Sequence, residues 1–296
     1  MDTVVDVSGG LRELALSVAR CPQLELARSS QVHPCHRVVS VQQASDPGLW
    51  QVPEGWAGNL ASARVIFLSS NPSISEPKDG MPASTAEAYP TQSEPDDVIA
   101  NFVVNRFPTH ATKESRHVCQ DGTLSTVVKF WAGVRVMATD LLGRPADPAL
   151  DYVMTEVVHC KSKDEIGVPE SLNMCTTMHL DRILAAAPTA PVVVILGGKA
   201  MARVRTVWEL PKNFASTKHR PQAQWAVRSI GGRQRVVLYL RHPAAYGKVS
   251  TVESAYRLVA SALRDVVAGR LGVENFAEQA GLTTGSVAAP APGPHL

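Results

Sequence analysis

The sequence predicts an α/β protein, a three-layer α/β/α sandwich around a central four-stranded parallel sheet. Four short apolar runs have the length and composition of buried strands, and they lie at residues 65–68, 152–158, 191–196 and 235–240. Each run is followed by apolar residues at helical spacing or by residues typical of a helix start. Strands that alternate with helices indicate a parallel sheet with helices on both faces.

Helices are expected where apolar residues recur at helical spacing. They are predicted at residues 9–20, 96–107, 126–142, 169–184 and 250–267, with a further helix from Lys199. Pro169 stands at a first helical position, and Ser250 with Glu253 forms a capping box for the last helix. Residues 51–58 are expected to be an extended connector, and residues 210–233 a polar excursion before the fourth strand.

Length and composition indicate one compact domain. The chain has 296 residues, of which 45% are hydrophobic and 19% are charged, so a sizeable core can be buried. We expect a single domain over residues 1–282, with the N-terminal helix and a cysteine-bearing segment in residues 1–60. Residues 283–296 are rich in Ala, Pro and Gly, which predicts a disordered tail.

Charge and hydropathy exclude some classes of partner. The formal net charge of +2 argues against a protein held to nucleic acid by bulk charge, although a local basic cleft stays open. No apolar run approaches the length of a membrane span, and the N-terminus lacks a charged-then-apolar leader. We therefore expect a cytoplasmic monomer without membrane contact. Five cysteines in that compartment indicate free thiols or metal rather than disulfides.

Polar residues end three of the four predicted strands. They are Ser70-Asn71-Pro72 after the first, Glu156 with His159 at the second and Arg241-His242-Pro243 after the last. Because the carboxyl ends of parallel strands share one edge of a sheet, these side chains are expected to face one crevice. Pro72 keeps Asn71 out of the helical region, so Asn71 either presents its side chain there or only caps the turn.

Two of these motifs resemble the signature motifs of the uracil-DNA glycosylase superfamily, Asn71-Pro72 after a strand and His242-Pro243 after the last strand. The intervening stretch is similar to the iron–sulfur branch of that superfamily. In that branch a strand ends in a cysteine, as in MTEVVHCKS, and a second cysteine lies on the next helix. A buried strand then ends in Leu-Gly, as in PVVVILGGKA, and RHPAAY resembles the second motif of the branch. The resemblance extends in order over residues 63–263.

The resemblance implies a DNA glycosylase, which flips a damaged or deaminated base out of the helix and hydrolyses its N-glycosidic bond. In that role His242 would donate a hydrogen bond to an oxygen of the leaving base. Asn71 would orient water, as in the mismatch-specific and single-strand-selective members. The iron–sulfur branch has an acidic residue one position earlier, where this chain has Ser70. This departure favours an Asn-type mechanism or a weaker enzyme.

The residues that would contact the base follow from the same resemblance. They are Ser70, Pro72, Tyr89 and Glu156. Tyr89 is the candidate for stacking on the flipped base, with Phe102 as an alternative on a core face. Glu156 stands where the superfamily has an Asn that binds uracil. An ionised carboxylate only accepts hydrogen bonds, so Glu156 suits an amine-bearing base better than uracil unless it is protonated. The other interpretation is that Glu156 pairs with a nearby Arg.

A 4Fe-4S cluster is the cofactor that the resemblance implies. Cys160 and Cys175 match the last two cluster ligands of the branch, and Cys21 resembles the second ligand of its first pair. Val18 stands where the first ligand should be, so Cys35 is the substitute. Thiolate ligation by four cysteines is the usual way such clusters are held. The alternative is four buried thiols left from a lost cluster.

DNA is the expected partner, single- or double-stranded. The predicted phosphate contacts are Lys218, Arg220, Arg228, Arg233 and Lys248, against the alternative of a solvated basic loop. Two other functions stay open. One is a catalytically weak or inactive glycosylase-like protein that binds DNA and senses altered bases. The other is a hydrolase in which Ser69, Ser70 or Ser73 acts with His242, although the Gly-x-Ser-x-Gly elbow of such enzymes is absent.

Overall fold

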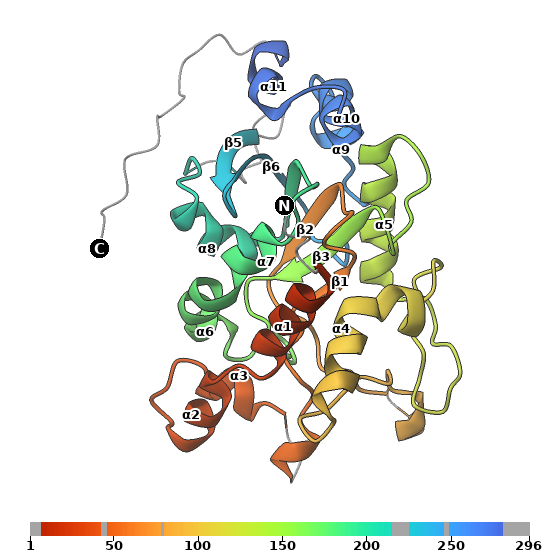
Figure 1. Cartoon of the computed structure of the whole chain (residues 1–296), viewed down its shortest axis with the longest axis vertical. Helices are drawn as coiled ribbons and strands as arrows, with labels where there is room; N and C mark the ends of the chain where they lie inside the picture. Colours follow the sequence, from red (N-terminus) through yellow and green to blue (C-terminus); the bar gives the residue numbers. More distant parts are fainter. Residues whose placement is uncertain are drawn as a thin grey trace, which may run out of the picture.

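A six-stranded mixed sheet forms the centre of the protein in a computed structural model (Figure 1). The model describes residues 7–42, 46–77, 80–212, 214, 225–245 and 249–280. The strand order is β1-β3-β2-β4-β6-β5. The strands are β1 (Trp56–Gly58), β2 (Val65–Ser69), β3 (Tyr152–Glu156), β4 (Val192–Leu196), β5 (Trp225–Ile230) and β6 (Arg233–Leu240). The predicted tail at 283–296 lies outside the described residues.

The four predicted strands are present and mutually parallel, but the prediction of a four-stranded, wholly parallel sheet is wrong. β3, β2, β4 and β6 pair in parallel, while β1 pairs antiparallel with β3 and β5 antiparallel with β6. β1 has three residues, too few for a visible period in the expected connector. β5 lies in the expected polar excursion, where the sequence WAVRSI carries an arginine and a serine because one of its edges is unpaired.

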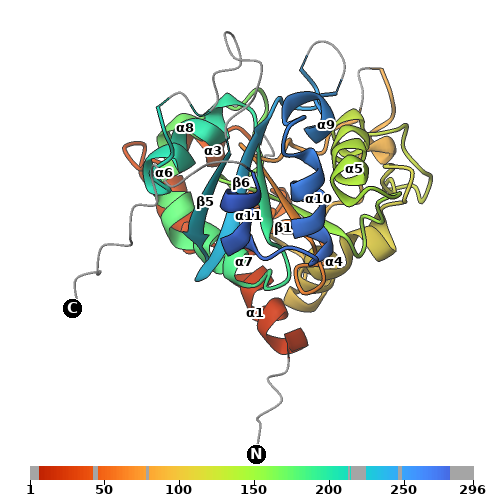
Figure 2. The ribbon, with the colours of Figure 1, turned by 90° about the horizontal axis from the view of Figure 1, so that it is seen from above.

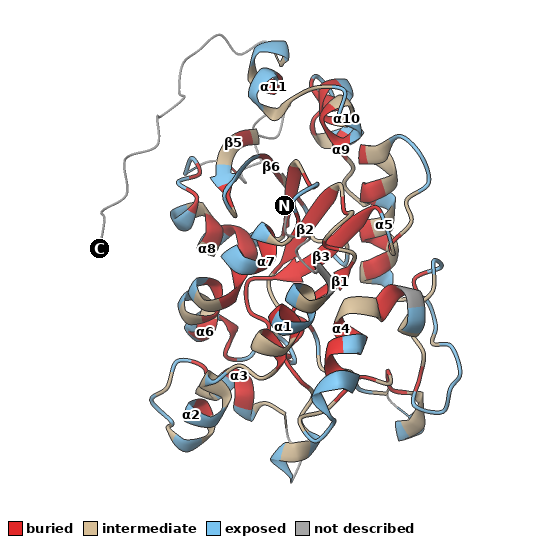
Figure 3. Cartoon of the chain, viewed as in Figure 1, coloured by how far each residue is buried: buried red, intermediate tan, exposed pale blue. Residues whose placement is uncertain are grey.

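Helices cover both faces of the sheet (Figure 2). Alternate residues of β2 point to opposite sides, so that Ile66 and Leu68 join one core and Val65 and Phe67 the other. The first core receives α1 (Val7–Ala19), α2 (Gln23–Ser29), α3 (His36–Ser40), α4 (Asp96–His110), α6 (Val168–Cys175), α7 (Asp181–Ala185) and α8 (Gly198–Val207). The second receives α5 (Lys129–Leu142), α9 (Val252–Ala255), α10 (Ala260–Ala268) and α11 (Val273–Gln279). Figure 3 shows that buried residues follow the central strands and the inner sides of these helices.

Two predicted helices are interrupted. The helix expected at 169–184 is α6, then a π-helical turn over Thr176–Leu180, then α7. The helix expected at 250–267 breaks between α9 and α10. Its capping box is Thr251 with Ser254, not Ser250 with Glu253. The break follows from Tyr256, whose hydroxyl accepts from the backbone N–H of Tyr239 at 2.7 Å and donates to its carbonyl at 2.9 Å, tying the chain to β6.

Among the described residues, no helix has both the length and the apolar character needed to cross a membrane. The parallel arrangement brings the carboxyl ends of β2, β4 and β6 side by side at one edge of the sheet. The segments that follow these three strands build the site described next.

Candidate functional site

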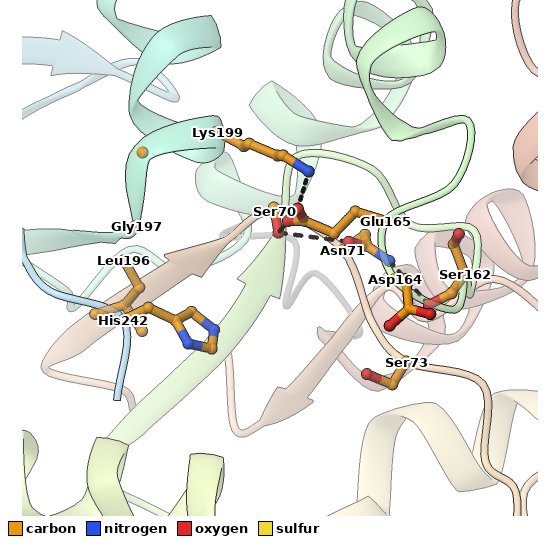
Figure 4. Close-up of a pocket in the computed structure, with 11 residues that line it drawn as sticks. Ser70, Asn71, Ser73, Ser162, Asp164, Glu165, Leu196, Gly197, Lys199 and His242 are labelled. Carbon is orange, nitrogen blue, oxygen red and sulfur yellow. Dashed lines mark hydrogen bonds and ion pairs between the residues drawn. The ribbon is translucent and has the colours of Figure 1, made fainter. Parts of the chain in front are cut away.

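A cleft of about 470 Å³ lies at the carboxyl ends of β2, β4 and β6 (Figure 4). Its lining residues are Ser70, Asn71, Ser73, Ser162, Asp164, Glu165, Leu196, Gly197, Gly198, Lys199 and His242. The structure therefore brings Asn71 and His242 together, although 171 positions separate them in the chain, from 71 to 242. Their convergence in one crevice is what the polar ends of the parallel strands predict.

Asn71 both lines the cleft and holds its own turn. Its Nδ2 donates to the carbonyl of Pro72 at 2.9 Å and more weakly to that of Ser162 at 3.5 Å. The hydroxyl of Ser70 lies 3.4 Å from Asn71 Oδ1. The donor side of the amide is thus used by the backbone, and the oxygen is the polar atom that Asn71 has for a water molecule.

His242 is held on the opposite side of the cleft from Asn71 by its own turn and by α5. The backbone N–H of Ala244 donates to His242 Nδ1 at 3.3 Å, so the neutral ring carries its proton on Nε2. Phe130 stacks on the imidazole, with ring centroids 5.0 Å apart and planes 23° apart. Burial lowers the pKa of His242, against the nearby Glu165 carboxylate. His242 is therefore a neutral hydrogen-bond donor near pH 7, and Figure 4 shows its ring directed into the cleft.

α5 reaches the His242-Pro243 turn because it has a glycine at the contact. A Cβ added to Gly133 would lie 2.4 Å from Cβ of Pro243, closer than real contacts allow. On the other side Gly197 has a φ of +87°, and an added Cβ would lie 3.5 Å from His242 Cβ. Gly133 on α5 and Gly197 after β4 therefore let neighbouring backbone pack closely against the His242-Pro243 turn.

An acidic group that the sequence reasoning missed lies in the same cleft. The hydroxyl of Ser70 donates to Glu165 Oε1 at 2.5 Å, and Lys199 forms an ion pair with the same carboxylate. Burial raises the pKa of Glu165, but the hydrogen bonds from Lys199 and Ser70 and the charge of Lys199 outweigh it, so the pKa lies below its usual value. The sequence signal was the charged loop KDE directly after the HCKS strand end.

Two of the three candidate serine nucleophiles donate to carboxylates. Ser69 Oγ donates to Glu156 Oε1 at 3.4 Å and Ser70 Oγ donates to Glu165. These contacts weigh against Ser69 and Ser70 as nucleophiles, whereas Ser73 lines the cleft and stays the candidate of the serine-hydrolase alternative.

Glu156 lies beneath the cleft in a buried charge network, not among the lining residues. Arg106 forms ion pairs with Glu54 and with Glu87, and Lys161 lies 3.6 Å from Glu54. Burial raises the pKa of Glu156 well above its usual range, and the charge of Glu54 raises it further, against Arg106 and Lys161. Two cations then face two carboxylates, and the raised pKa of the fifth member, Glu156, favours its protonated form. Its Oε2 has no hydrogen-bond partner among the described residues.

Tyr89 packs inside the protein rather than at the cleft. It is 6% exposed, its ring meets Phe102 edge-on at 4.9 Å, and the Lys161 ammonium lies 3.6 Å from the ring centroid. Phe102 is 3% exposed on the same core. The aromatic ring that contacts a residue of the cleft is the half-buried Phe130 on α5, which stacks on His242.

Two of the five predicted phosphate contacts, Arg228 and Arg233, belong to the described part of the chain, and neither lines the cleft. Lys218, Arg220 and Lys248 lie outside the described residues. Arg228 donates to the backbone carbonyls of Trp208, Val227 and Glu209, which braces the end of α8. Arg233 begins β6 and so lies at the amino end of that strand, opposite the cleft. Among the described residues, Lys199 lines the cleft and the exposed Arg241 directly precedes His242.

Four cysteines converge at a second place, between α2, α3 and the start of the π-helical turn. Cys21, Cys35, Cys160 and Cys175 line one small cavity, together with His179 and the methionines 174 and 178. Burial raises the pKa of Cys160, and the neighbouring thiols of Cys175, Cys21 and Cys35 raise it further. Cys119 is buried elsewhere and lines neither site.

Hydrogen bonds already reach these sulfurs. The backbone N–H of His159 donates to Cys175 Sγ at 3.2 Å, and His179 Nε2 lies 3.3 Å from Cys21 Sγ. Within the described ranges, no group of three or more His, Cys, Asp or Glu side chains is arranged to hold a single metal ion. A tetrahedral ion needs its sulfurs about 4 Å apart, because Zn–S bonds are about 2.3 Å long. A four-iron cluster instead binds one thiolate at each of its four iron atoms, so its cysteines lie farther apart. The lack of a single-ion site among the described residues therefore does not test the cluster.

No family model matches the chain, and no curated protein is found to be similar to it.

Proposed function

We propose that the chain is a DNA glycosylase that hydrolyses the N-glycosidic bond of a flipped-out damaged or deaminated base. The observation that carries this proposal is the convergence of Asn71 and His242, from the ends of β2 and β6, in one cleft. The cleft has the size expected for a small-molecule ligand such as a nucleobase with its sugar.

The chemistry divides between the two residues. Nε2–H of neutral His242 would donate to an oxygen of the departing base and stabilise the negative charge that develops there. Oδ1 of Asn71 would accept a hydrogen bond from the water that attacks the anomeric carbon. The neutral imidazole of His242 keeps its Nε2 proton and shares it in a hydrogen bond. It can therefore stabilise the negative charge on the leaving base at neutral pH.

Phe130 takes the stacking role that the sequence suggested for Tyr89. Its ring already stacks on His242 and is partly exposed, whereas Tyr89 is enclosed by Phe102 and Lys161. Stacking of a base on an aromatic ring is tolerant of sequence and contributes about 1–3 kcal/mol per base.

Glu156 leaves the choice of base open. It is buried and is not among the residues that line the cleft. Uracil and an amine-bearing modified base therefore both stay candidate substrates of the proposed enzyme.

The cysteine donor set fits a 4Fe-4S cluster held by Cys21, Cys35, Cys160 and Cys175. Such a cluster would cross-link the N-terminal segment to the β3 strand end and to α6. Hydrolysis needs no electron transfer, so its role here would be structural, and the N–H of His159 would stabilise a thiolate at Cys175.

A base-sensing protein without catalysis is the second candidate. The observations that favour it are the Ser at position 70 and the use of Asn71 Nδ2 by its own turn. Both features weaken the activation of the attacking water, and neither changes the contacts that would bind a base.

Substitution of the two motif residues separates these functions. Asn71→Ala and His242→Ala should each lower the rate of abasic-site formation by about 100-fold or more, since each removes one transition-state contact. Their dissociation constants for the same oligonucleotide should stay within about twofold. If the wild type binds altered DNA and forms no abasic product, the base-sensing function replaces the glycosylase.

A further inference from the structure

A carboxylate occupies the place that Ser70 leaves open in the first motif. Ser70 has no acidic group, but its hydroxyl donates to Glu165 Oε1 at 2.5 Å, which brings a carboxylate from a different segment to the end of β2. Glu165 and Asn71 both line the cleft. The first motif has no acidic residue in the sequence, but the fold places the carboxylate of Glu165 beside it.

We propose that Glu165 is a catalytic residue of this site: its carboxylate orients the attacking water together with Asn71 and stabilises positive charge on the anomeric carbon. The inference rests on the proposed glycosylase function and names the residue that supplies the acidic group in this chain. An oxocarbenium-like transition state, as in other glycosidic hydrolyses, is stabilised by a negative charge beside the sugar.

The loop that carries Glu165 is fixed on both sides. Ser162 N–H donates to the Pro72 carbonyl at 3.0 Å, and Ser162 Oγ donates to the Ile166 carbonyl at 2.6 Å. Gly167 has a φ of +76°, and an added Cβ would lie 2.1 Å from the backbone nitrogen of Val38 on α3. The loop is thus pressed between the Asn71-Pro72 turn and α3, which suits a group that must be positioned before the reaction.

The backbone at the carboxylate is strained. Glu165 has a φ of 57°, in the left-handed region that residues other than Gly, Asn and Asp rarely occupy, and Asp164 before it has a φ of 52°. Such strain persists where the surroundings enforce it, and it is concentrated at functional sites. Asp164 also lines the cleft, but it is exposed to solvent, whereas Glu165 is partly buried and paired.

The surrounding charges keep Glu165 ionised. Lys199 on α8 pairs with it, His242 after β6 faces it, Ser70 after β2 donates to it, and Asp164 is its acidic neighbour on its own loop. The pKa of Glu165 lies below its usual value, because the contacts from Lys199 and Ser70 outweigh the effect of burial. An ionised carboxylate at this position is a stabiliser of cationic charge more than a strong base.

Water is the only co-reactant that the hydrolysis needs. The water oxygen forms a bond to C1′ of the deoxyribose while the C1′–N bond breaks, and that electron pair leaves with the base, whose oxygen accepts the Nε2–H hydrogen bond of His242. The proton of the attacking water passes to the Glu165 carboxylate and then to solvent or to the released base. The products are an abasic site with a hydroxyl on C1′ and the free base.

The test is a single-turnover assay on an oligonucleotide that the wild type cleaves. Glu165→Gln should lower the rate by about 100-fold, within the usual range for a positioned acid–base group, and leave the DNA dissociation constant within about twofold. Glu76→Gln is the matched control, because Glu76 pairs with Lys163 at 3.3 Å outside the cleft. That variant should keep the wild-type rate.

A pH profile separates catalysis from a structural role. Lys199→Met removes the cation that lowers the pKa of Glu165, so the acid limb of its pH–rate profile should shift to higher pH relative to the wild type. A wild-type rate in Glu165→Gln, or an unshifted acid limb in Lys199→Met, overturns the role of Glu165 while the glycosylase function stands. Absence of product from the wild type on every altered base overturns both.

Discussion

At the scale of single residues, Glu156 is the side chain whose chemistry differs most from its appearance in the sequence. Read as an ionised Glu, it favours an amine-bearing base over uracil. In the fold it is one of five charged or chargeable groups in a closed network, where Arg106 and Lys161 already balance Glu54 and Glu87. Arg106 and Lys161 outweigh burial and hold the pKa of Glu87 at about 2, whereas burial and Glu54 raise that of Glu156.

This asymmetry predicts a pH dependence of stability. The pKa of Glu156 is higher in the folded than in the unfolded chain, so folded protein binds the extra proton between the two values. Its contribution to stability is complete below the unfolded pKa and falls as pH rises towards the folded one, by on the order of 1 kcal/mol per pH unit. Glu156→Gln should remove that fall.

Urea unfolding of the wild type and Glu156→Gln at pH 5 and pH 8 measures this effect. The variant should gain stability relative to the wild type at pH 8 and little at pH 5. An equal difference at both pH values would mean that Glu156 is ionised in the folded protein.

Residue-level reasoning from sequence found Asn71 and His242 because each directly follows an apolar strand, a signal carried by neighbouring letters. It missed Glu165 and Phe130 because their proximity to the motifs depends on the loop conformation after β3 and on the approach of α5. It assigned stacking to Tyr89 because that residue follows the motif in the chain, whereas the fold places the ring against Phe102 in the core.

At the scale of elements, α5 is the helix that fixes the second motif. Its glycine lets the helix axis come close to Pro243, so a methyl group there must push the turn and His242 away. The same helix supplies Phe130 against the imidazole. α5 therefore positions His242 from one side, and the β6 strand end from the other.

Gly133→Ala should accordingly destabilise the protein by about 1–3 kcal/mol and lower turnover, because overpacking displaces the turn. Gly10→Ala on α1 is the matched control, since an added Cβ meets nothing within 4 Å. That variant should gain up to about 1 kcal/mol from helix propensity and keep full turnover. Equal thermal unfolding midpoints for the two variants would show that the α5 contact is not tight.

Elements with strong periodicity were predictable, and the interruptions were not. The four central strands and α5 can be recognised from the apolar pattern of their sequences. The break after α9 cannot, because it depends on tertiary hydrogen bonds between Tyr256 and Tyr239. β1 and β5 are short or polar edge strands, and their pairing is decided by the strands beside them.

At the scale of the whole molecule, the cysteine cavity links the N-terminal helices to the β3 strand end that also begins the cleft loop. Glu165 comes five positions after Cys160 in the chain. A bound cluster would therefore fix the position of the cleft loop as well as that of the cysteines. Cys21 and Cys35 come from the first 60 residues, which the sequence assigned to the same domain. Loss of the cluster should loosen that connection.

Iron content is the direct measurement for this feature. Anaerobically prepared protein should contain about four iron atoms and four sulfides per chain, the stoichiometry of a 4Fe-4S centre. Cys160→Ser should lose the iron and unfold at a lower temperature, whereas Cys119→Ser, a buried thiol outside the cavity, should retain it. Full iron content in Cys160→Ser would show that Cys160 is not a cluster ligand, and anaerobically prepared wild type without iron would leave the cysteines as plain buried thiols.

The glycosylase function itself is decided by product formation. Wild type and His242→Ala are incubated with oligonucleotides that each carry one altered base, among them uracil, hypoxanthine, xanthine and ethenocytosine, and abasic sites are revealed by alkaline strand cleavage. We expect an abasic site on at least one substrate, with a rate about 100-fold or more lower in His242→Ala. Cleavage that is unchanged in His242→Ala, or no cleavage of any substrate by wild type that binds the same DNA, would contradict it.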